Sequence, residues 1–134
     1  MANGIFQKMT QKNFPKKSCK EPPFFKDIKK DGYHIYSLDN AKTPNFYPPE
    51  LPDYPGVALK DLKEGDTITI RVFFGIGKGE KMRVDGGHID LRVEFVDEDS
   101  VMAVITTQLP ENFAMRTGES IEVFEKEILC KVDS

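Results

Sequence analysis

The feature that most constrains the fold is a period-two alternation of apolar and polar side chains in two segments of the sequence. Every second residue is apolar in residues 67–74 and 88–95, namely Ile68, Ile70, Val72 and Phe74, then Ile89, Leu91, Val93 and Phe95. Successive side chains of a strand point to opposite faces, so this spacing is typical of a half-buried β-strand. Both segments are therefore predicted to be strands with one buried and one polar face.

Further strands are predicted around these two. Residues 101–106 follow the acidic turn 97–99 and are apolar on both faces, which indicates a central strand that forms a hairpin with residues 88–95. Short strands are expected at residues 34–38 and 120–124, and the spacing of apolar residues after 124 fits a helical turn as well as a strand. The predicted fold class is mainly β, or α+β, as an antiparallel sheet or a small, partly open barrel.

Two parts of different character are expected along the 134 residues. Residues 1–32 are rich in lysine and interrupted by prolines, which predicts a loosely structured basic N-terminal arm. Its four phenylalanines indicate that part of the arm lies on the body. Residues 33–134 are predicted to form a single, mainly antiparallel β domain, in which the five prolines of residues 43–56 favour an extended segment that wraps the domain.

Two glycine-rich segments could carry a binding function. Residues 75–80 follow a strand, but their spacing matches neither G-x-x-x-x-G-K-[ST] nor G-x-G-x-x-G, so a hairpin loop is predicted rather than a phosphate site. Residues 85–87, Asp-Gly-Gly, are expected to interrupt a long strand with a bulge or a tight turn. Such a bulge would re-aim a neighbouring side chain.

The candidate site is the polar face of the strand at residues 88–95. His88, Asp90, Arg92 and Glu94 project from this face, and Glu122 is added from the last predicted strand. Neighbours on one strand face lie ~7 Å apart, too far to enclose an ion without another strand. We predict a binding surface and assign no catalytic residue, metal ligand or cofactor. The alternative is a small hydrolase or metal-dependent enzyme that uses His88 with nearby carboxylates.

Charge is distributed unevenly along the sequence. Residues 1–45 carry nine lysines against four acids, whereas the rest carries ten basic and 18 acidic residues. Acids gather near the end at Glu111, Glu119, Glu122, Glu125 and Glu127. This charge distribution predicts a small protein-binding module with an immunity or inhibitor-type role. Its expected partner is another protein, and a basic protein is one candidate. Nucleic acid is disfavoured because the basic arm has no arginine and few aromatic residues to stack on bases.

The expected compartment is the cytoplasm. No apolar run approaches the ~20 residues of a membrane-spanning helix, and the first eight residues lack the apolar stretch of a signal peptide. Cys19 and Cys130 are predicted to be free thiols, because a lone, widely separated pair without an export signal is typical of a reducing compartment.

Several turn segments of the chain follow a pattern that is also found in a known family. They are residues 63–66 before a strand, 79–82 after it, the turn at 97–99, and residues 109–110 and 117–120. Over about half of its length, the chain thereby resembles a bacterial family known as domain of unknown function 2314. The family typically has a tryptophan near the position of Met82, and this chain has no tryptophan. The resemblance implies a bacterial origin and, as in some members, an immunity or defence-associated role. It assigns no functional residue.

Overall fold

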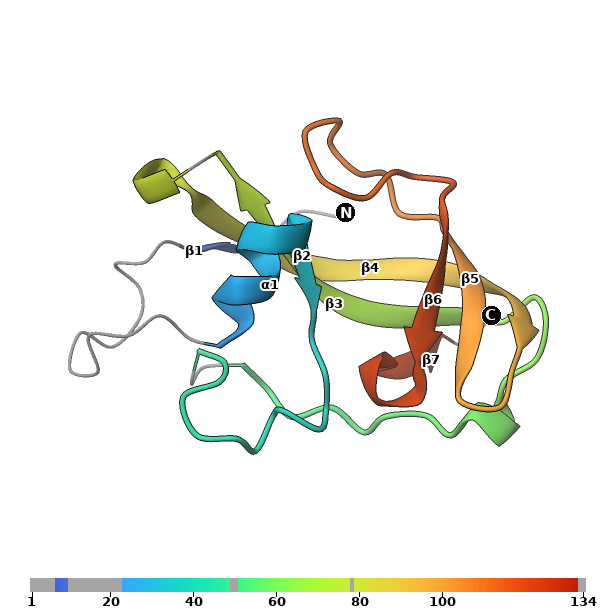
Figure 1. Ribbon diagram of the computed structural model, residues 1–134. Helices are drawn as coiled ribbons and strands as arrows, with labels where there is room; N and C mark the ends of the chain where they lie inside the picture. The colour runs from blue at the N-terminus through green and yellow to red at the C-terminus, as the bar shows by residue number, and fades with distance from the viewer. Residues whose placement is uncertain (1–6, 10–22, 49–50, 78, 133–134) are drawn as a thin grey trace.

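The core of the fold is one curled antiparallel sheet (Figure 1). The computed structural model describes residues 7–9, 23–48, 51–77 and 79–132. The strand order is β2-β3-β4-β5-β6, with β2 at Tyr33–Ile35, β3 at Thr67–Ile76, β4 at Arg83–Val96, β5 at Ser100–Ile105 and β6 at Ser120–Phe124. In addition, β1 at Gln7–Met9 pairs with β4 and β7 at Cys130–Val132 pairs with β3. The predicted fold class is confirmed.

The alternation in the sequence places the main core on one face of the sheet. Most of its fully buried side chains come from β3, β4 and β5, namely Ile68, Ile70, Val72, Phe74, Ile89, Leu91, Val101, Ala103 and Ile105. β4 and β5 form the predicted hairpin, and β5 lies between β4 and β6. The prediction that residues 101–106 form a central strand is therefore confirmed.

Phe95 corrects the predicted alternation, because its side chain is 54% exposed instead of buried. Up to Val93 the pairing with β5 is regular, with Val93 opposite Ala103, but Phe95 then lies opposite Met102. This shift of one residue is a β-bulge, and a one-residue slip moves a side chain to the other face of the sheet. Phe95 consequently lies on the outer face, together with Met102.

Gly86 and Gly87 correct a second expectation. They do not form a bulge or a turn, because β4 continues through them with regular pairing to Phe73 and Val72 of β3. On its other side, Gly86 also pairs with Gln7 of β1. Pairing with β3, and for Gly86 also with β1, holds the glycines in an extended strand, and the bulge of β4 is found at residues 93–95 instead.

Helix α1, at Phe24–Asp31, covers the opposite face of the sheet. Phe24 and Phe25 are 0% exposed and belong to a second hydrophobic cluster with Phe73 of β3. A Cβ atom added at Gly75 would lie 2.5 Å from Ile28, so the helix packs directly on the strand where the glycine leaves room. No helix of the described residues is long and apolar enough to cross a membrane.

The boundary of the N-terminal arm is therefore wrong for residues 24–31. These residues form a buried helix of the body, which ends at Gly32 with a φ of 86° and a hydrogen bond of 2.8 Å from its amide to the carbonyl of Ile28. Eight residues are two turns, too short for a sustained period of 3.6 to be visible in the sequence. Apart from the three residues of β1, the remainder of the predicted arm, with Cys19, lies outside the described residues.

The proline-rich segment wraps the second cluster, as predicted. Tyr47, Leu51 and Tyr54 pack on this cluster from residues 43–56, of which 49–50 lie outside the description. Phe73 belongs to this second cluster and the adjacent Phe74 to the main core, so the two hydrophobic clusters lie on opposite faces of β3.

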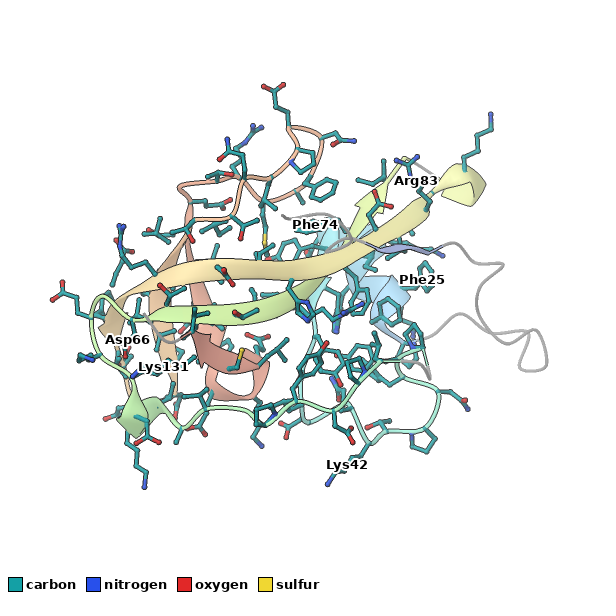
Figure 2. The ribbon with its side chains drawn as sticks, turned by 180° about the vertical axis from the view of Figure 1, so that it is seen from behind. Phe25, Lys42, Asp66, Phe74, Arg83 and Lys131 are labelled. Atoms are coloured by element: carbon teal, nitrogen blue, oxygen red, sulfur yellow. The ribbon has the colours of Figure 1, made fainter. Side chains whose placement is uncertain are left out.

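An ion pair lies at the far end of the sheet. Nζ of Lys131 in β7 lies 3.4 Å from Oδ2 of Asp66, in the turn before β3 (Figure 2).

Candidate functional site

The predicted site residues lie in two separate places. His88 and Asp90 are half-buried and lie on the face of the sheet that Tyr54 covers. Arg92 and Glu94, further along β4, are exposed. The hydroxyl group of Ser120 in β6 donates a hydrogen bond of 2.7 Å to Oε1 of Glu94. The structure therefore brings Glu94 towards β6, the strand that also carries Glu122. His88 and Asp90 lie at a separate place on the sheet, away from Glu94 and Glu122.

His88 is part of a polar contact between the sheet and the proline-rich segment. Its Nε2 atom lies 2.9 Å from the hydroxyl oxygen of Tyr54, to which Nη1 of Arg71 donates a hydrogen bond of 3.4 Å. Burial lowers the pKa of His88, the charge of Arg71 lowers it further, and Asp90 raises it. The ring is therefore favoured in its neutral form.

Asp90 is held by groups other than His88. Its Oδ1 atom accepts a hydrogen bond of 2.8 Å from the hydroxyl group of Thr69, and its amide donates to Oγ1 of Thr107. The enzyme alternative requires carboxylates that converge on His88, whereas the hydrogen-bonded neighbour of His88 is a tyrosine. Within the described ranges, no group of three His, Cys, Asp or Glu residues is placed to hold a metal ion.

His34 makes a second such contact, which was not predicted from the sequence. Its ring is 8% exposed, with Nδ1 at 2.9 Å from Oδ2 of Asp27 and Nε2 at 2.8 Å from the hydroxyl oxygen of Tyr47. Burial lowers the pKa of His34, although Asp27 partly offsets this effect. The imidazole thus links α1 to the proline-rich segment, a structural role that only the tertiary structure reveals.

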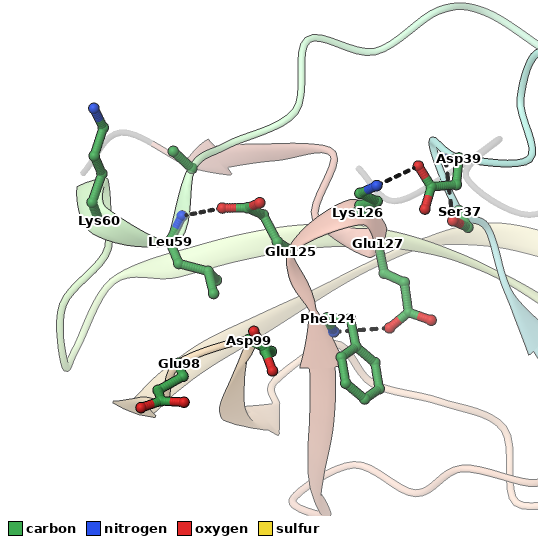
Figure 3. Close-up of a pocket in the computed structure, with 11 residues that line it drawn as sticks. Ser37, Asp39, Leu59, Lys60, Glu98, Asp99, Phe124, Glu125, Lys126 and Glu127 are labelled. Carbon is green, nitrogen blue, oxygen red and sulfur yellow. Dashed lines mark hydrogen bonds and ion pairs between the residues drawn. The ribbon is translucent and has the colours of Figure 1, made fainter.

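A pocket of about 650 Å³ lies where β6 leaves the sheet (Figure 3). Four segments line it: residues 37–39, residues 58–60, the turn between β4 and β5, and the end of β6 with the 3-10 helix η5 at Glu125–Glu127. Its charged groups are the acids Asp39, Glu98, Asp99, Glu125 and Glu127 and the lysines Lys60 and Lys126. The lining is therefore acidic on balance.

Hydrogen bonds fix several groups of this pocket (Figure 3). Oε2 of Glu125 accepts a hydrogen bond of 2.9 Å from the amide of Leu59. One lysine is already paired, since Nζ of Lys126 lies 2.7 Å from Oδ1 of Asp39. Glu98 and Asp99, both exposed at the turn of the β4–β5 hairpin, leave their carboxylates accessible to a ligand.

The fold shifts the ionisation of Glu127, one of the acids of the pocket. Burial raises its pKa, the hydrogen bond from the amide of Phe124 lowers it, and the charge of Glu122 raises it. A buried carboxylate is stabilised by a nearby cation. A cation beside Glu127 would therefore favour the ionised form of its carboxyl group.

Exposed apolar side chains lie beside this pocket. Phe124, which lines it, is 47% exposed. By strand register, Phe124 shares the outer face of the sheet with Glu122, which lies opposite Met102, and Met102 in turn lies opposite Phe95. The predicted binding residue Glu122 therefore lies between two exposed aromatic side chains of the outer face.

Comparison with known proteins adds nothing to this geometry. No family model, curated protein or solved structure matches the chain. The resemblance to domain of unknown function 2314 stays a prediction.

Most of the pocket was not predicted from the sequence. The acidic run near the end of the chain indicated Glu125 and Glu127, but Asp39, Glu98 and Asp99 come from segments that are distant in sequence. The acidic turn at residues 97–99 was interpreted only as a hairpin connection. Its position next to η5 depends on the pairing of β5 with β6, which local patterns do not encode.

Proposed function

We propose that this chain is a small protein-binding module that holds a basic segment of another protein at its acidic pocket. The observation that carries the proposal is the pocket itself. It combines five carboxylates with two lysines and borders Phe124, a large apolar side chain that is 47% exposed.

The chemistry of this pocket suits lysine and arginine side chains. Carboxylates form charge-assisted hydrogen bonds with both cations, and acidic surfaces speed the encounter with basic partners. Aromatic residues are enriched among the side chains that contribute most to binding energy at interfaces. Phe124 supplies such a residue beside Glu98 and Asp99. The exposed carboxylates of these two acids form no ion pair with another described residue that would have to break before a cation binds.

We further propose that the module acts in the bacterial cytoplasm as an immunity or inhibitor-type accessory protein. An acidic surface of this kind would cover a basic surface on a target enzyme. Two observations support this proposal: the acidic excess after residue 45, and Cys130, a free thiol on β7. The enzyme alternative receives less support, because the ring of His88 contacts Tyr54 and no carboxylate among the described residues hydrogen-bonds to it.

A titration with a labelled peptide tests the proposed function. The probe is an alternating lysine–valine peptide of about seven residues, and its affinity is measured by fluorescence anisotropy at low and moderate salt. The double variant Glu98→Gln/Asp99→Asn is expected to bind the probe roughly 3- to 10-fold more weakly, because each exposed ion pair contributes up to about 1 kcal/mol. Added salt is expected to weaken binding by the wild type.

The matched control is Glu111→Gln, which removes an exposed acid outside the pocket. It is expected to leave the affinity within about twofold of the wild type. An alternating glutamate–valine peptide serves as the second control and should not bind. Equal losses in the pocket variant and in the control would show non-specific attraction and would refute the acidic pocket as the binding site.

A further inference from the structure

Strand β6 is the last strand in the order of the sheet, and only β5 pairs with it among the described residues (Figure 1). We infer that the basic partner segment binds in an extended conformation and adds to the sheet as a new strand along β6. This inference rests on the proposed function, since it specifies how the basic segment is held.

The register of β5 and β6 determines which backbone groups of β6 face outward. The amide of Ile105 donates a hydrogen bond of 2.9 Å to the carbonyl of Glu119, so these residues face each other across the ladder. Bonded and non-bonded pairs alternate in an antiparallel ladder. Ile121 and Val123 therefore bond to β5, whereas the amide and carbonyl groups of Ser120 and Glu122 point away from it.

These outward groups form an open edge. No described residue donates or accepts a backbone hydrogen bond at the outward amides and carbonyls of Ser120 and Glu122. A row of such groups is a template for an added strand, and main-chain hydrogen bonds then supply affinity. A peptide residue opposite Glu122 would exchange two hydrogen bonds with it, and another residue would do the same with Ser120.

The outward amide of Phe124 marks one end of this open edge. It donates a hydrogen bond of 2.9 Å to Oε1 of Glu127, which takes the place that a carbonyl of the added strand would occupy. The side chain of Glu127 therefore closes the ladder where the pocket begins. The binding edge consists of Ser120 and Glu122, with the acidic pocket at its end.

Side-chain alternation in β6 specifies the chemistry of the partner. Peptide side chains on the same face as Glu122 would meet its carboxylate and that of Glu94, which accepts a hydrogen bond from Ser120. Lysine or arginine suits these positions. The intervening side chains would lie on the face of Ile121 and Val123, where the main core begins, and apolar residues suit them. The partner segment thus alternates basic and apolar residues.

The charges near the open edge are consistent with this occupant. Glu119 directly precedes β6, Glu122 lies within it, and Glu127 lies three residues after its end. A second copy of the chain paired through β6 would bring Glu122 near its own equivalent, and like charges across a strand pair are destabilising. The acidic edge thus favours a basic partner over self-association.

The decisive experiment compares two substitutions of one residue. Glu122→Pro removes the charge, the hydrogen bond that Oε2 of Glu122 accepts from Ser100, and the outward amide. Glu122→Thr removes the same charge and hydrogen bond but keeps the amide and retains a good strand former. Relative to the wild type, the threonine variant is expected to bind the lysine–valine probe roughly threefold more weakly. The proline variant is expected to bind at least roughly tenfold more weakly than the threonine variant, because one hydrogen bond is lost and the ring obstructs the edge. Circular dichroism and thermal unfolding verify that both variants fold.

Backbone N-methylation of the probe gives a second measurement on the wild-type protein. Methyl groups on the amides of one edge of the peptide should abolish binding, while methylation of the other edge should leave it nearly unchanged. Strand addition would be overturned if methylation of either edge of the peptide left its affinity unchanged and if the proline and threonine variants bound the probe equally well. The acidic pocket would then remain as the binding site. Absence of binding by the unmethylated probe would instead refute the proposed function itself. A wild-type dimer in sedimentation that Glu122→Pro dissociates would assign the edge to a second copy and overturn the inference.

Discussion

The amide of Phe124 donates a hydrogen bond of 2.9 Å to Oε1 of Glu127, three residues later in the chain. This bond terminates the open edge of β6 and fixes a half-buried acid in the wall of the pocket (Figure 3). The ionisation of Glu127 is thereby connected both to the stability of this turn and to the charge that a ligand meets.

The substitution Glu127→Gln is expected to raise the free energy of unfolding at pH 7. Burial raises the pKa of Glu127 above its value in the unfolded chain, so the ionised form destabilises the folded state. The glutamine oxygen can still accept the hydrogen bond from Phe124. The gain should disappear as the pH falls below about 4, where the wild-type carboxyl is protonated in both states. Urea unfolding at both pH values, with Glu111→Gln as control, measures the difference. A variant less stable than the wild type at pH 7 would contradict this account.

The substitution Phe124→Ala should weaken binding of the lysine–valine probe by roughly 5- to 30-fold, or about 1–2 kcal/mol, as expected for an aromatic contact residue. Because the side chain is 47% exposed, the free energy of unfolding should change by less than about 1 kcal/mol. Phe95→Ala is the matched control, since Phe95 is 54% exposed and does not line the pocket. Anisotropy titrations should show a smaller loss for the control. An equal loss in both variants would place the apolar contact elsewhere on the outer face.

Side-chain alternation was sufficient to predict the strands, but it did not predict for every residue which face of the sheet its side chain occupies. Ile89, Leu91 and Val93 are buried as the alternation requires, whereas Phe95 is exposed because the register with β5 shifts after Val93. A bulge depends on how two strands pair, and one strand alone does not reveal it. Gly86 shows the converse, because neighbouring strands on both sides keep a glycine in a strand that local propensity would interrupt.

The candidate site was predictable only where it follows from one strand. The outward position of Glu122 follows from the alternation in residues 120–124, and the structure places it on the outer face. The pocket next to β6 also needs Asp39 and Glu98, which are brought together only by the path of the proline-rich segment and by the β4–β5 hairpin. Contacts of such long range are properties of topology rather than of local sequence.

The free energy of unfolding should decrease as the pH falls from about 7.5 towards 5.5. Burial lowers the pKa of both His34 and His88 below the value of 6.5, so in this range the unfolded chain binds protons more readily than the folded protein. The stability provided by neutral histidine is present above pH 6.5 and is lost as the pH falls towards the lower folded pKa. The double variant His34→Gln/His88→Gln should show a flatter profile in urea unfolding followed by circular dichroism. An unchanged slope would mean that other groups, such as the acids, dominate the dependence.

The substitution Phe24→Ala tests whether helix α1 is an integral part of the body. The ring of Phe24 is 0% exposed and lies 4.9 Å, centroid to centroid, from the ring of Phe73 in β3. Removing a buried phenylalanine typically costs about 3–5 kcal/mol, because transferred surface and packing contacts are both lost. Lys26→Ala, at an exposed position of the same helix, should change the free energy of unfolding by less than about 0.5 kcal/mol. If Phe24→Ala also cost less than about 1 kcal/mol in chemical denaturation, the helix would be only loosely docked on the sheet. A single cooperative transition with the full loss would instead show that α1 and β3 unfold together, as their shared cluster requires.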